Sequence, residues 1–189
     1  MIQAQTNQQE VEYSAILDVP ASAIDLAGWI RNFKPDEYRA CTPATGNHFF
    51  MLGYLDGDGN NIYRNDERCG PVWMVQLYRE SIMEPHHVFL VSPATRALVL
   101  GFWPMRTQVT WDLTAKPVEG DKTRFTCRIG YRMNPIYYVL ARFFLAIGFF
   151  MEAHCEEETP HFANFAARFA MRNAPDRRES YLLPKNQVS

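Results

Sequence analysis

One stretch near the C-terminal end of the chain restricts the fold more than any other. From Ile136 to Met151 the sequence reads IYYVLARFFLAIGFFM and is almost wholly apolar, interrupted by Arg142. A helix this apolar needs a partner surface that removes it from water. Its residues recur at helical spacing and form one predicted face: Leu140, Phe144, Ile147, Met151 and Cys155.

A second helical segment follows within 135–171. Thr159 is a typical N-cap residue and Pro160 a typical first helical residue, so the pair predicts a new or kinked helix. Crossing a bilayer takes about 20 apolar residues, whereas the run at 136–151 is shorter and contains Arg142. We therefore expect burial inside the domain in place of a membrane span or a helix lying on a membrane. The stripe of the second segment is Phe162, Phe165, Ala166 and Phe169.

The clearest alternation of apolar and polar residues precedes this helix and predicts a β-hairpin. Its arms are Met105–Lys116 and Lys122–Met133, joined by a turn at 117–121. Slipping either arm by one residue would expose Trp111 and Phe125, so the pattern specifies the register. The predicted inner face of the first arm is Met105, Thr107, Val109, Trp111, Leu113 and Ala115. That of the second arm is Thr123, Phe125, Cys127, Ile129, Tyr131 and Met133.

The remaining elements are read from shorter patterns. Val11–Val19 alternates as a half-buried strand, and two short helices are expected at 20–30 and from Lys34. On the strand Val72–Ile82 we place Trp73, with Val75, Leu77 and Arg79, on the inner face. Further strands are expected at His48–Leu55, Ile62–Tyr63, His87–Val91 and Arg96–Trp103, the last two flanking Ser92-Pro93.

These elements predict an α+β fold in which a curved antiparallel sheet of about seven strands wraps around a long C-terminal helix. A sheet with one solvent-exposed face must bury its other face. Only the segment 135–171 is long and apolar enough to cover that buried face. A helix of about 24 residues is about 36 Å long, which matches strands of about ten to twelve residues at about 3.3 Å each. We expect one domain over 11–172, with tails at 1–10 and 173–189.

The order resembles the START-like or SRPBCC superfamily, whose helix-grip fold occurs in polyketide cyclase/dehydratases and lipid-transfer proteins. The matching segments are VEYSAILDVPASAIDLAGWI, the hairpin TQVTWDLTAKPVEGDKTRFTCRIGYRM and the closing helix, together covering about Val11 to Met171. The resemblance implies a seven-stranded sheet and a deep hydrophobic cavity beneath the last helix. It does not choose between enzymes, transfer proteins and binding proteins.

Composition narrows the function classes. A net charge of −2 gives no reason to expect a nucleic-acid partner. The cysteines Cys41, Cys69, Cys127 and Cys155 lie far apart and read as reduced, buried thiols. The N-terminal residues MIQAQTNQQ are polar and contain no signal peptide or anchor, so we expect a cytoplasmic protein. The sequence does not indicate an oligomeric state.

Three groups of residues have the composition of metal ligands, and each has a simpler interpretation. Asp56, Asp58, Asn60 and Glu67 copy part of a calcium loop but are better explained by a hairpin turn. His154, Glu157 or Glu158, and His161 could form a zinc set, although a solvated acidic helix end is the simpler reading. His86 and His87 would point to opposite faces of a strand. We therefore predict neither a metal nor a cofactor.

The sequence favours binding or transport of a hydrophobic small molecule, such as a lipid, a polyketide or an aromatic compound. An apolar cavity with a few convergent donors suits such a ligand. The first alternative is a polyketide cyclase/dehydratase in which Tyr131 or His154 supplies acid–base catalysis. The second is a peripheral membrane protein that uses 136–151 as its contact surface. The predicted ligand-binding residues are Trp73, Arg79, Thr107, Val109, Trp111, Phe125, Cys127, Tyr131, Phe144 and Met151.

Overall fold

The computed structural model describes residues 8–136, 138–139 and 147–173, and its main element is one antiparallel sheet of seven strands. The strand order is β1-β7-β6-β5-β4-β3-β2, so β1 joins the end of the sheet formed by the C-terminal hairpin. The strands are β1 (Gln8–Leu17), β2 (His48–Leu55), β3 (Asn61–Cys69), β4 (Val72–Glu84), β5 (His87–Val99), β6 (Trp103–Val118) and β7 (Lys122–Arg132).

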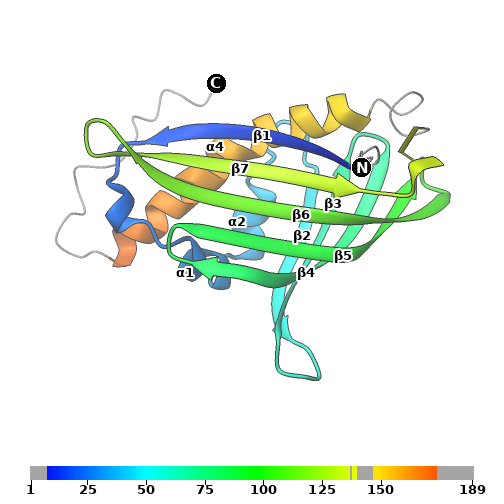
Figure 1. The fold of residues 1–189 in the computed structure, drawn as a ribbon, viewed down its shortest axis with the longest axis horizontal. Coiled ribbons are helices and arrows are strands. Elements are labelled where there is room, and N and C mark those ends of the chain that lie inside the picture. The colour runs from blue at the N-terminus through cyan, green and yellow to red at the C-terminus, as the bar shows by residue number, and fades with distance from the viewer. Residues whose placement is uncertain (1–7, 137, 140–146, 174–189) are drawn as a thin grey trace, which may run out of the picture.

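Helices cover one side of this sheet, as Figure 1 shows. A 3-10 turn, η1 (Ala21–Ala23), and two short helices, α1 (Leu26–Arg31) and α2 (Pro35–Arg39), follow β1 as expected. Asp25 caps α1 by accepting a hydrogen bond of 2.8 Å from the backbone N–H of Gly28. The long helix α4 (Ile147–Asn173) packs against β1 and β7. The predicted α+β helix-grip architecture is confirmed.

The hairpin of β6 and β7 has the predicted register. Trp111 pairs with Ile129, and Leu113 pairs with Cys127, with all four side chains buried on the inner face. Helix α4 contributes small and aromatic residues to the same core, among them Phe162, Ala163 and Ala166. The alternation of apolar residues therefore located the core on this part of the sheet.

The inner face of β4 is the opposite of the predicted one. Val72, Met74, Gln76 and Tyr78 are buried, whereas Trp73 is 43% exposed on the outer face. Trp73 stacks there on Phe49 with ring centroids 4.4 Å apart. Both faces of this strand carry large apolar side chains, so the alternation alone did not distinguish inside from outside.

Strand β5 is continuous, although two strands were predicted around Ser92-Pro93. Its pairing with β6 skips from Ser92 to Thr95, so Pro93 lies in a bulge where it need not donate a hydrogen bond. The Ser92 hydroxyl accepts a hydrogen bond of 3.0 Å from the backbone N–H of Leu77, which supports the neighbouring strand at this irregularity.

Helix α4 continues through Pro160, where a new or kinked helix was predicted. The Thr159 hydroxyl donates a 2.6 Å hydrogen bond to the carbonyl oxygen of Cys155 and so bonds within the helix without capping it. Pro160 is exposed, so the Glu156 carbonyl that loses its N–H partner lies on the solvent side. The predicted helix face at Leu140 and Phe144 lies outside the described residues.

Two other expectations concern the surface. The turn between β2 and β3 projects from the body of the protein (Figure 1), and Asp56 accepts hydrogen bonds from the backbone N–H groups of Asp58 and Asn60. These residues form the predicted hairpin turn, and Glu67 is buried away from it. Within the described ranges, no helix is long and apolar enough to cross a membrane.

Candidate functional site

A cluster of polar side chains lies inside the core, between the sheet and the helices. His48 begins β2, Glu67 lies on β3, and His154 and Glu158 lie one turn apart on α4. Each is at most 7% exposed, although charged and ionisable groups are rarely buried without partners. Such a cluster costs folding free energy, which makes it a candidate functional site.

Three atoms of this cluster meet closely. The Nε2 atom of His48 lies 3.1 Å from Oε2 of Glu158 and 3.2 Å from Nε2 of His154. The His154 Nε2 atom is in turn 3.4 Å from the same Glu158 oxygen. Glu67 approaches from the sheet, with its Oε2 atom 3.8 Å from His48 Nε2 and 4.0 Å from His154 Nε2.

A second set of hydrogen bonds orients these side chains. Tyr38 on α2 donates its hydroxyl hydrogen to Oε2 of Glu67 at 2.6 Å, and Gln76 donates its amide to Oε1 at 2.7 Å. The backbone carbonyl of Tyr38 lies 2.9 Å from Nδ1 of His48. A carbonyl can only accept, so Nδ1 carries the hydrogen and Nε2 of a neutral His48 ring has a free electron pair.

Burial controls the protonation of the cluster. It raises the pKa of Glu158 to about 8, an effect that neighbouring His154 opposes and the Glu67 carboxylate reinforces. Burial also lowers the pKa of His48. In the absence of another cation, Glu158 therefore retains a proton near neutral pH, and the cluster can exchange a proton or hold a positive ion.

A buried thiol, that of Cys127, lies beside this cluster and is protonated. The Sγ atom of Cys127 donates to Oε1 of Glu158 at 3.7 Å, and the Cys155 thiol points to the Cys127 carbonyl at the same distance. Burial, followed by the neighbouring Cys155 thiol, raises the pKa of Cys127 well above its usual value. A thiol of this kind is a poor nucleophile.

An apolar cavity adjoins the cluster on the inner face of the sheet. Its volume is about 30 Å³, and Gln76 belongs both to its wall and to the hydrogen bonds around Glu67. The other lining residues come mainly from β4 to β7 and α4: Val72, Met74, Ala97, Met105, Thr107, Val109, Tyr131, Met133 and Met151. Between the described residues, the deep cavity implied by the family resemblance is a narrow space.

A wider groove of about 580 Å³ lies where β4 begins, β5 ends and β6 begins. Arg96 and Arg106 are direct cross-strand neighbours there, and Trp73, Leu98 and Pro104 complete much of the lining. The adjacent β5–β6 turn exposes three large apolar side chains, Leu100, Phe102 and Trp103, which are 58%, 71% and 49% exposed.

The predicted ligand-binding residues fall into different places. Thr107, Val109, Tyr131 and Met151 line the cavity, whereas Trp111, Phe125 and Cys127 are buried in the core but are not among its lining residues. Trp73 borders the outer groove. The contacts of these eight residues with a ligand stay a prediction.

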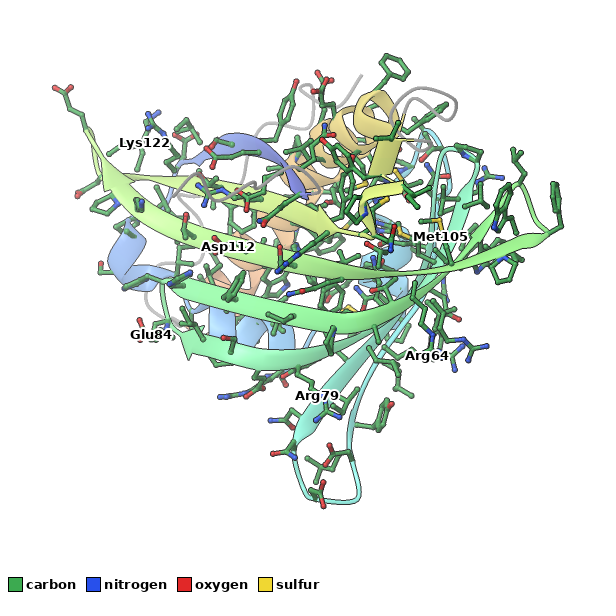
Figure 2. The ribbon with its side chains drawn as sticks, turned by 45° about the vertical axis from the view of Figure 1, so that its right-hand side comes forward. Arg64, Arg79, Glu84, Met105, Asp112 and Lys122 are labelled. Carbon is green, nitrogen blue, oxygen red and sulfur yellow. The ribbon has the colours of Figure 1, made fainter. Side chains whose placement is uncertain are left out.

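Two other predicted positions need comment. Arg79 is exposed and lies beside the projecting β2–β3 hairpin (Figure 2). Its Nη1 atom is 3.4 Å from Oδ2 of Asp56. Its side chain is on the outer face of β4, and the prediction was wrong because the two faces of this strand had been assigned the wrong way round. Phe144 lies outside the described residues.

The buried cluster was not predicted as a unit. The HCEEE segment was interpreted as a solvated acidic helix end, but His154 and Glu158 are buried. Glu157 faces the surface, where its carboxylate accepts hydrogen bonds from the loop at Ala44 and Thr45. His48 was not singled out. The available signal was on β3, where Asn65 and Glu67 occupy inner positions of an alternating strand.

The comparisons with known proteins concern the fold. No protein-family model and no curated protein sequence matches the chain. A conserved protein from Geobacillus kaustophilus is 13% identical, with a TM-score of 0.55, 85% of this chain covered and 96% of that one. The Thermus thermophilus protein TTHA0849 is 14% identical, with a TM-score of 0.57 and coverages of 85% and 99%.

A third solved structure is an aromatase/cyclase from a Streptomyces species, at 13% identity, a TM-score of 0.47, and coverages of 88% and 96%. At such identities a structural similarity establishes only the fold. The two bacterial structures share the helix-grip fold expected from the element order, and that fold is confirmed.

Proposed function

We propose that this chain, which has the START-like helix-grip fold, binds a hydrophobic small molecule in the cavity between the sheet and α4. The observation that carries this proposal is the composition of the cavity wall. Four methionines line it, together with three polar side chains that could orient a ligand: Gln76, Thr107 and Tyr131. Ligand sites of this type combine apolar walls with a few polar groups.

The size of the cavity determines how a ligand enters. Pockets for drug-sized ligands have volumes of about 300–1,000 Å³, far above the 30 Å³ found here. Binding therefore requires side chains to move aside. Methionine is suited to this because it is unbranched and adapts its shape at low cost, and Met74, Met105, Met133 and Met151 line the space.

The direct test is to identify what the cavity accepts. Native protein is extracted with organic solvent and analysed by mass spectrometry, and a panel of fatty acids and polyaromatic compounds is screened by thermal unfolding. A ligand at 100 times its dissociation constant adds about 2.7 kcal/mol to the free energy of unfolding. No extracted compound and no shift with any panel member would contradict the proposal.

A matched pair of variants locates the binding site. Val109→Phe fills the cavity, whereas Val75→Phe adds the same bulk in the outer groove. We expect only Val109→Phe to abolish the thermal shift caused by a ligand. Loss of the shift in Val75→Phe alone would place the ligand in the outer groove.

An enzymatic use of the same cavity is a second candidate, favoured by the position of Tyr131 in its wall. The Tyr131 hydroxyl donates a 2.7 Å hydrogen bond to Gln9, at a site where it could protonate a bound substrate such as a polyketide-like chain. General acid catalysis is worth about 10²–10⁴ in rate. Activity that survives both Tyr131→Phe and His154→Ala would exclude both predicted catalytic residues.

Membrane contact is a third candidate. The observation that favours it concerns the β5–β6 turn, whereas the sequence had indicated the segment 136–151 as the contact surface. Leu100 adopts a φ of 52° at the tip, a conformation unfavourable for leucine that holds its side chain in solvent. Arg96 and Arg106 lie below the turn, where anionic lipid would relieve their mutual repulsion. We expect co-sedimentation with anionic vesicles, weakened by salt and by Phe102→Asp. Equal binding to neutral vesicles would contradict the role of the arginines.

A further inference from the structure

The buried cluster presents several electron pairs to one point. The Tyr38 carbonyl holds the hydrogen of His48 on Nδ1, so Nε2 faces Glu158 and His154 as an acceptor. Acceptor atoms 3.1–3.4 Å apart repel each other unless a proton or a cation lies between them. The arrangement therefore needs either a shared proton, such as the one held by Glu158, or a cation at its centre.

The distances match the ligand shell of a small metal ion. A tetrahedral zinc ion with bonds of about 2.0–2.1 Å has ligand atoms about 3.3–3.4 Å apart. The triangle formed by the Nε2 atoms of His48 and His154 and by Oε2 of Glu158 has sides of 3.1, 3.2 and 3.4 Å. Glu67 Oε2 is farther away, at 3.8 and 4.0 Å from the two histidine nitrogens, so its carboxylate would have to shift closer to complete the shell.

We propose that His48, Glu67, His154 and Glu158 bind one divalent transition-metal ion and that zinc fits the site best. Imidazole nitrogens favour zinc and its neighbours over magnesium and calcium, which prefer all-oxygen shells. Two carboxylates and two neutral imidazoles balance the charge of a divalent ion. Among the described residues, these carboxylates have no lysine or arginine within 4.0 Å.

The surroundings of His48 and Glu67 have the form expected around metal ligands, whereas Nδ1 of His154 is buried without a hydrogen-bond partner. A ligating histidine commonly donates its other N–H to a backbone carbonyl, and ligating carboxylates are held by hydrogen bonds. His48 meets the first condition through Tyr38, and Glu67 meets the second through Tyr38 and Gln76. Four protein ligands close the shell, so the ion joins β2, β3 and α4 and stabilises the fold.

The test begins with wild-type protein and needs no assumption about the hydrophobic ligand. The full chain is freed of metal with a chelator, equilibrated with Zn²⁺ or Co²⁺, and analysed for metal content, melting temperature and X-ray absorption. We expect one ion per chain, a higher melting temperature, and a shell of imidazole nitrogen and oxygen without sulfur. Absence of binding would overturn the proposal, as would sulfur ligands, which would indicate Cys127, Cys155 and Glu158.

Variants then test the individual ligands against matched controls on the same helix. His154→Gln and Glu158→Gln should abolish binding, whereas His161→Gln and Glu157→Gln should retain it, since neither residue contributes an atom to the cluster. Tyr38→Phe should weaken metal affinity about 10–100-fold. Unchanged affinity in the two ligand variants would overturn the assignment. If they do not fold, X-ray absorption of wild-type protein decides it. A negative result in the hydrophobic-ligand panel leaves all these readouts unaffected.

Discussion

At the scale of single residues, the inner face of the sheet depends on Trp111. The side chain is 3% exposed, and its ring lies 5.2 Å from that of Phe162 on α4 and 5.9 Å from that of Tyr78. Trp111→Asp removes these contacts and buries an unpaired carboxylate, so we expect a loss of about 4 kcal/mol or more in unfolding free energy. Urea denaturation followed by far-UV circular dichroism measures this loss.

Trp73 provides the matched control on the opposite face. It is half exposed and stacks on Phe49, a contact worth about 0.5–1.5 kcal/mol. Trp73→Asp should therefore cost about 1 kcal/mol. A larger loss in Trp73→Asp than in Trp111→Asp would show that the faces of the sheet have been assigned the wrong way round.

The two tryptophans also show where single-residue prediction succeeds. Trp111 lies on a strand whose other face is uniformly polar, so its alternation identifies the buried side. Strand β4 has apolar residues on both faces, and its orientation depends on pairing with neighbours. The contact between His48 and His154 could not be predicted from local sequence patterns. The two residues are 106 positions apart and meet through the packing of α4.

The four cysteines permit a second prediction at this scale. All are buried, and burial raises the pKa of the Cys41, Cys69 and Cys127 thiols. A thiol that stays protonated and inaccessible reacts slowly. We expect iodoacetamide to leave native protein unlabelled near neutral pH and to label all four thiols in urea, as measured by intact mass. Rapid native labelling of any of them would contradict the burial described here.

At the scale of elements, the continuity of α4 through Pro160 can be tested with a single substitution. Pro160 lacks the N–H that would bond the Glu156 carbonyl, and it lies on the exposed side of the helix. Proline is about 3 kcal/mol less favourable than alanine inside a helix. Because the helix already accommodates Pro160, we expect Pro160→Ala to stabilise the protein by about 1–3 kcal/mol, measured by thermal unfolding. A destabilised variant would mean that the proline shapes the packing of α4.

Prolines account for two of the errors in predicting element boundaries. Pro160 and Pro93 each indicate a break when only neighbouring residues are considered. In the structure, Pro93 lies in the bulge of a continuous strand, and Pro160 lies within a continuous helix. Long-range pairing and packing stabilise the surrounding element by more than the local preference disfavours it.

At the scale of the whole molecule, the architecture was predictable because few arrangements could satisfy the sequence. One long apolar helix and a set of amphipathic strands of similar length bury each other in only a few ways. The size of the cavity was not predictable in this manner. A space of 30 Å³ is a small difference between the volume enclosed by sheet and helix and the volume of the side chains that fill it.

That small volume leads to a prediction about how stability and binding are related. Met74 is buried in the cavity wall, and Met74→Ala should lower the free energy of unfolding by about 2–5 kcal/mol. If ligand entry requires this side chain to move aside, the same variant should bind a fatty-acid probe more tightly, since the cost of moving it has been removed. Fluorescence titration and urea denaturation measure the two effects.

Met83→Ala is the control for that experiment, because Met83 packs against the core without lining the cavity. It should lose stability and leave the affinity for the probe unchanged. A Met74→Ala variant that loses both stability and affinity would show that Met74 contacts the ligand directly and that the site is preformed. The opposite changes in stability and affinity are those expected of a protein that closes over an almost empty site and opens when the ligand binds.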